Sequence, residues 1–72
     1  MNSALEARRQ LVREDPNYQR LVRKHEEYDS RLQELRSRKY LSDDEQMEEV
    51  RLKKLKLALK DQMEAIVRRA AS

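Results

Sequence analysis

Residues 42–67, SDDEQMEEVRLKKLKLALKDQMEAIV, give the strongest evidence in the sequence for a long helix. Ser42, followed three residues later by Glu45, matches a capping box, in which each side chain binds the backbone N–H of the other residue. A helix should therefore begin at Asp43. Neither glycine nor proline interrupts the following residues, so the helix should run to about Arg69.

Apolar residues lie on two sides of this helix. At about 100° per residue, one group falls within an arc of roughly 80° and should face another helix. This group is Leu52, Leu55, Leu59, Met63 and Ile66. Val50 and Leu57 project from nearly the opposite side, whereas a helix lying on a membrane would gather its leucines on one face. We therefore predict that Val50 and Leu57 belong to a protein interface.

A second long helix should precede this one. Asp15 is a good N-cap, and Pro16 is favoured at the first helical position, where its missing N–H costs nothing. The residues that follow at steps of three and four form one heptad seam, typical of a helix with a single partner. The seam is Tyr18, Leu21, His25, Tyr28, Leu32 and Leu35.

These signals predict an all-α chain in which residues 15–70 form an antiparallel helical hairpin. Its parts are a helix over 16–39, a turn over 40–42 and a helix over 43–69, since a short connection favours antiparallel neighbours. We expect Tyr40 to pack over the turn. The hairpin should be held by Leu21, Tyr28, Leu32, Leu35, Leu52, Leu55, Leu59, Met63 and Ile66. Residues 1–14 form a short N-terminal extension that can adopt a frayed helix.

Length and composition point to self-association in a reducing compartment. A chain of 72 residues buries barely enough apolar area to offset its lost entropy, so a homodimer that forms a four-helix bundle is expected. There is no cysteine, which excludes disulfides and thiolate metal sites. No apolar run is long enough for a signal peptide or a membrane span, so we expect a cytoplasmic protein.

The charge pattern leaves nucleic-acid binding open as an alternative function. Net charge is +3, but 17 basic residues stand among 14 acidic ones, a weaker signal than a concentrated basic patch. Phosphate contacts could come from segment 51–60, but Glu49, Asp61 and Glu64 lie close to it along the helix, and no aromatic platform accompanies it. The candidate residues are Arg51, Lys53, Lys54, Lys56 and Lys60.

No catalytic, cofactor or metal site is predicted. His25, the single histidine, occupies a seam position and is best explained by packing. Metal sites in helical bundles use Glu-x-x-His, but Val22 stands three residues before His25, and Asp29 would add only a second ligand. Without glycine there is no phosphate loop, and no serine has a histidine partner at a predictable spacing. We expect a protein that is not an enzyme.

Residues 15–67 resemble the YdcH-like family of small bacterial proteins of unknown function. The matching features are an Asp-Pro or similar start, an apolar pair, a histidine followed by an apolar or aromatic residue, a serine-capped second helix and a Leu-Lys-Lys-x-Lys-Leu-x-Leu-Lys-Asp segment. They correspond here to Asp15-Pro16, Leu21, His25, Tyr28, Ser42, Leu52-Lys53-Lys54, Lys56-Leu57 and Leu59-Lys60-Asp61. Leu55 stands where the pattern has Glu, and residues 1–14 lie outside it. The resemblance implies a self-associating helical hairpin and no known activity.

The leading hypothesis is therefore a non-enzymatic cytoplasmic homodimer that acts by protein contact. The alternative is a nucleic-acid-binding accessory protein that uses segment 51–60. A peripheral membrane helix is a third and weaker option.

Overall fold

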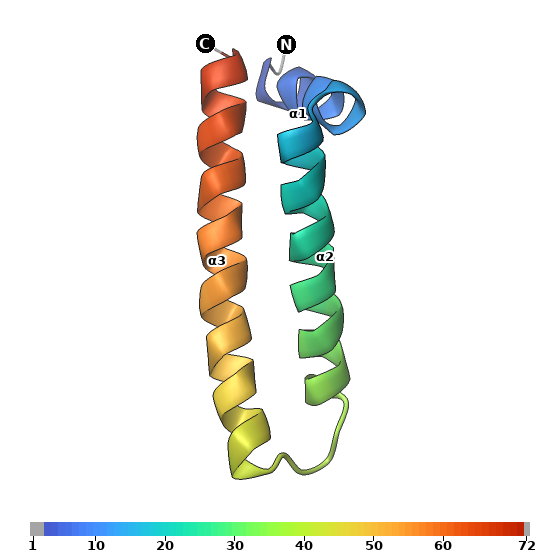
Figure 1. The fold of residues 1–72 in the computed structure, drawn as a ribbon, viewed down its shortest axis with the longest axis vertical. Helices are drawn as coiled ribbons and strands as arrows, with labels where there is room; N and C mark the ends of the chain where they lie inside the picture. Colours follow the sequence, from blue (N-terminus) through green and yellow to red (C-terminus); the bar gives the residue numbers. More distant parts are fainter. Residues whose placement is uncertain (1–2, 72) are drawn as a thin grey trace.

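A computed structural model describes residues 3–71 as three helices (Figure 1). They are α1 (Ser3–Glu14), α2 (Pro16–Arg36) and α3 (Asp43–Ala71), and no strand occurs within residues 3–71. Helices α2 and α3 lie side by side and run in opposite directions, while α1 lies across the end of the pair that is distant from the connection (Figure 1). The predicted all-helical fold class is confirmed.

The start of each long helix is fixed by the cap expected from the sequence. The backbone N–H of Tyr18 donates to Asp15 Oδ1 at 3.0 Å, and Pro16 follows the cap. At the start of α3 the capping box is reciprocal. The N–H of Glu45 donates to Ser42 Oγ at 3.2 Å, and the N–H of Ser42 donates to Glu45 Oε1 at 3.0 Å. Donors at both helix starts are thus satisfied locally.

Helix α2 ends earlier than predicted, at Arg36 and not at Lys39. The N–H of Ser37 donates to the carbonyl of Gln33 at 3.0 Å, and the Ser37 hydroxyl donates to the carbonyl of Glu34 at 2.7 Å. With these carbonyls satisfied, the helix can stop, and residues 37–42 cross the gap of about 8–10 Å that separates packed helix axes. The connection is therefore longer than the predicted turn over 40–42.

The connection packs through a different residue from the one expected. Tyr40 is exposed, so the prediction that it covers the turn is wrong. Leu41 packs instead against the buried residues beside the connection. Helix α3 ends at Ala71, two residues beyond the predicted Arg69, a difference of the size by which the ends of helices commonly fray.

Apart from Leu59, the buried side chains form two clusters at opposite ends of the helix pair. The connection cluster consists of Leu32, Leu35 and Leu52, with Tyr28 and Leu41 packed against it. The α1 cluster consists of Ala7, Tyr18 and Val67; the part-buried residues around it are Leu11, Val22, Met63, Ile66 and Ala71. Helix α1 therefore supplies part of the core, although the sequence suggested only a frayed extension.

Most of the predicted hairpin residues are buried or part-buried, but Leu55 is not. Its side chain is 40% exposed, whereas Val67, which was not predicted, is buried against Ala7 and Tyr18. On a helical wheel Leu55 and Val67 lie on opposite flanks of Leu52. Because α1 covers the flank of α3 that carries Val67, this flank is buried and that of Leu55 is left at the solvent boundary.

Leu35, with 0% exposure, offers a direct test of the connection cluster. We expect Leu35→Ala to lower the free energy of unfolding by about 2–5 kcal/mol, because it removes buried methyl groups and leaves a cavity. Urea unfolding followed by circular dichroism measures the change. The control is Val12→Ala on the half-exposed side chain of Val12, which should alter stability by no more than about 0.5 kcal/mol. Equal effects of the two variants would contradict the assigned core.

Candidate interaction surface

The side of α3 that faces away from α2 carries large apolar side chains. Met47, Val50 and Leu57 are 63%, 52% and 59% exposed. They belong to a row of exposed residues spaced alternately by four and three positions, which is the spacing of a coiled-coil seam. We call this row the outer stripe; it consists of Asp43, Met47, Val50, Lys54, Leu57 and Asp61.

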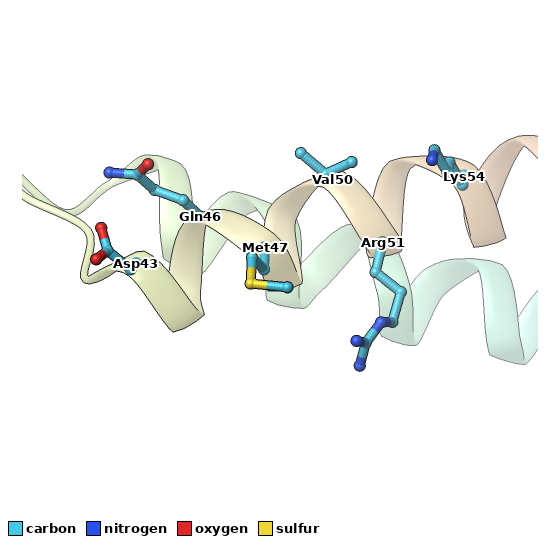
Figure 2. A pocket seen from close by; sticks show the side chains of 6 residues that line it. All are labelled: Asp43, Gln46, Met47, Val50, Arg51 and Lys54. Carbon is cyan, nitrogen blue, oxygen red and sulfur yellow. The ribbon is translucent and has the colours of Figure 1, made fainter.

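The first four residues of the outer stripe line an open groove of about 630 Å³. Figure 2 shows the six lining side chains, all carried by α3, with Met47 and Val50 on adjacent turns. Asp43 lies at one end of the groove and Lys54 at the other, while Gln46 and Arg51 complete its lining. The groove is thus apolar in the middle and oppositely charged at its two ends.

Part of this surface was predicted from the sequence. Val50 and Leu57, predicted as interface residues, are both exposed on the side of α3 opposite its buried residues. Met47 was missed, although its position three residues before Val50 placed it in the same heptad row. The role of Val50 and Leu57 in an interface stays a prediction.

The five basic residues predicted as nucleic-acid contacts do not form one surface. Arg51 and Lys54 line the groove on the outer side of α3. Lys53, Lys56 and Lys60 instead line a depression of about 190 Å³ between α3 and α2. Other residues of this depression are His25, Leu32, Arg36 and Leu57, so Leu57 lies at the border between the depression and the outer stripe.

Two of these lysines already have acidic partners. Lys56 forms an ion pair with Asp29 of α2, and this contact lowers the pKa of Asp29 from its ordinary value of 3.8. Lys53 Nζ lies 3.3 Å from Glu49 Oε1. An ion-paired lysine offers less free charge to a phosphate, so the depression is less attractive to an anion than its lysine content suggests.

A bidentate ion pair also joins α2 to α3. Arg31 donates from Nε to Glu48 Oε2 at 2.8 Å and from Nη2 to Glu48 Oε1 at 2.9 Å. These hydrogen bonds lower the pKa of Glu48 from its ordinary value of 4.5 and raise the pKa of Arg31. The paired fork geometry fixes the position of one helix along the other more strictly than a single contact would.

The geometry offers no metal-binding constellation within residues 3–71. No group of three or more histidine, aspartate or glutamate side chains among them is placed to hold an ion. Asp29, considered with His25 as a ligand pair, instead accepts hydrogen bonds from Lys56 and from Gln33, the latter at 2.9 Å. His25 is part-buried and lines depressions beside α3.

Comparison with known families identifies the relationship that the sequence suggested. The family described as protein of unknown function, DUF465, matches residues 19–67, which is more than half of the chain. The chain belongs to this family. The YdcH-like resemblance is therefore confirmed, and DUF465 membership brings no assigned activity. No curated protein and no solved structure matches the chain.

The matched segment contains most of α2 and α3, together with the whole outer stripe. Helix α1 lies outside it. Within residues 3–71 of this DUF465 chain, no helix is both long enough and apolar enough to cross a membrane.

The ion pairs between the two helices predict a loss of stability in acid. Asp29 and Glu48 have lowered pKa values in the folded chain, so their stabilisation is present above the ordinary values of 3.8 and 4.5. It disappears as the pH falls through the lowered values. We expect the melting temperature to fall as the pH drops below about 4.5, and Glu48→Gln to reduce that fall.

Circular dichroism melts at a series of pH values measure this dependence. The matched control is Glu26→Gln, an exposed position on the same helix as Arg31. It should keep the acid dependence of the original chain. An equal reduction by both substitutions would show that the Arg31–Glu48 pair does not carry the effect.

Proposed function

We propose that this chain is a non-enzymatic protein that acts by protein contact and associates with itself through the outer stripe of α3. The observation that carries the proposal is the exposure of Met47, Val50 and Leu57 in one heptad row. Scattered exposed apolar residues are normal on protein surfaces, but a row with seam spacing favours a helical partner.

The small core gives a physical reason for such association. Each cluster contains only three buried apolar residues, and within residues 3–71 no disulfide or metal cluster supplements them. Burial of the outer stripe against a second copy would remove more apolar area from water and stabilise the folded chain by mass action. Two hairpins of α2 and α3 would then form a dimer with four long helices, and the lack of cysteine suits the expected cytoplasm.

Substitution of Leu57 by aspartate tests this proposal. We expect the original chain to show a mass that rises with concentration toward that of a dimer, and Leu57→Asp to shift it toward the monomer, because a charge would be buried in the contact. Light scattering over a concentration series measures the mass, and circular dichroism confirms that the helices persist.

Val12→Asp is the matched control, since it places the same charge on a half-exposed apolar position of α1. This control should leave the mass unchanged. A mass and a melting temperature that Leu57→Asp leaves unaltered would refute a contact through the outer stripe.

The alternative function is nucleic-acid binding in the depression between α2 and α3. Its support is that His25, Arg36, Lys53, Lys56 and Lys60 share one lining. We rank it second because Asp29 and Glu49 pair with two of the lysines. No tyrosine, phenylalanine or tryptophan, on which bases commonly stack, is among the residues that line the depression.

Binding of a fluorescent single-stranded or duplex DNA or RNA at low ionic strength tests the alternative. If it holds, affinity should fall steeply as salt rises, and Lys53→Gln with Lys60→Gln should reduce the slope by about one for each phosphate that the variant no longer neutralises. Lys24→Gln, an exposed position on α2 outside the depression, is the control. An absence of salt-sensitive binding removes this function.

A further inference from the structure

We propose that the outer stripe accepts a second copy of itself in one antiparallel register, with Met47 of each chain facing Val50 of the other. This inference rests on the proposed self-association and specifies its geometry. In an antiparallel coiled coil, residues meet in layers in which one chain's numbering rises as the other's falls. Fixing the Met47–Val50 layer therefore fixes every other layer.

The neighbouring layers are complementary in this register. Asp43 of one chain faces Lys54 of the other, and the twofold symmetry repeats this opposite-charge layer. Both residues line the groove at its two ends (Figure 2). The apolar centre of one groove thus meets the apolar centre of the other, and the acidic end of each groove meets the basic end of the other.

The positions on either side of the layers fit as well. In antiparallel pairs, equivalent flanking positions face each other, which brings Asp44 opposite Arg51 and Gln46 opposite Lys53. Leu57 lies outside the part of α3 that faces α3 of the second copy. It lies at the level of the second copy's connection, which carries the exposed Tyr40. The most exposed apolar side chain of the connection thus lies at the level of an apolar residue of the second copy.

Other arrangements of the same stripe place like charges together. A parallel pair sets Asp43, Lys54 and Asp61 each against its own copy. An antiparallel pair shifted by one heptad sets Asp43 against Asp61 and Val50 against Lys54. Like-charge contacts and a buried unpaired lysine are both unfavourable, so the Met47–Val50 register is selected against these competitors.

The register limits the contact between the two α3 helices to a short part of each, and Leu57 meets the connection of the second copy beyond this part. Residues 43–54 overlap with the same residues of the second copy, a length of about 18 Å at 1.5 Å per residue. Because the outer stripe faces away from α2, the four long helices lie in one layer with the two α3 helices in the middle. An interface of about three helical turns falls at the low end of the usual areas, so the dimer should dissociate on dilution.

Charge reversal across the Asp43–Lys54 layer tests the register. Lys54→Glu places two carboxylates opposite each other in both symmetric layers and should weaken dimerisation at least roughly tenfold, as measured by light scattering or sedimentation. Asp43→Lys added to Lys54→Glu should restore the dimer. Lys24→Glu on α2 is the control for net charge and should have no such effect. A double variant as weak as Lys54→Glu, with its helicity retained, would overturn the register.

Cysteine cross-linking gives a second test that depends on distance, since the chain has no cysteine of its own. In the proposed register the two Val50 positions are offset by about 4.5 Å along the helices, and the two Leu57 positions by about 25 Å. With diamide as the oxidant, Val50→Cys should give a disulfide-linked dimer, and Leu57→Cys should remain a monomer on a non-reducing gel.

The outcomes separate the register from the proposed function. Cross-linking of both variants would indicate a parallel pair and overturn the register, while self-association would stand. A dimer mass without cross-linking at Val50 would also overturn it. A chain that is monomeric at every concentration would overturn both the register and the proposed self-association.

Discussion

The packing of Leu32 and Leu35 of α2 against Leu52 of α3 is the contact on which the rest of the structure depends. These residues form the cluster next to the connection, and Leu32 and Leu35 are the most completely buried large side chains among residues 3–71. Once Leu52 faces α2, the rotation of α3 about its own axis is fixed. Met47, Val50 and Leu57 must then face solvent, because they lie on the opposite side of the helix. The exposed row is a consequence of the core contact.

Electrostatic contacts beside this core decide which charges remain available to partners. Arg31 of α2 and Glu48 of α3 form an ion pair on one flank of the helix pair. Asp29 of α2 and Lys56 of α3 form an ion pair on another flank. Each pair helps to set the position of α3 along α2, and each removes a charge from the pool that a ligand could use. The basic segment 51–60 therefore looks stronger as a phosphate site in sequence than in the folded chain. Such pairing leaves Lys54, on the outer stripe, better placed for a protein contact.

Helix α1 gives the distal end of the helix pair a core that α2 and α3 do not complete alone. Ala7 packs with Tyr18 and Val67, so residues of all three helices meet there. The DUF465 match begins at residue 19 and leaves this helix outside. In this chain the first helix thus acts as a cover over one end of the pair. It leaves the outer stripe open, since that surface lies on the far side of α3.

The helical class, both long-helix starts and the two-sided apolar pattern of α3 could be predicted from the sequence alone. These follow from local rules: Asp15-Pro16 and Ser42 with Glu45 cap their helices through hydrogen bonds within one turn, and a period of 3.6 residues places Val50 opposite Leu52. The burial of Val67 in place of Leu55 and the pairing of Lys56 with Asp29 follow instead from the packing of the helices against one another. These features depend on how closely α2 and α3 approach each other and on which flank of α3 is covered by α1. The spacing of apolar residues within one helix gives no information about either.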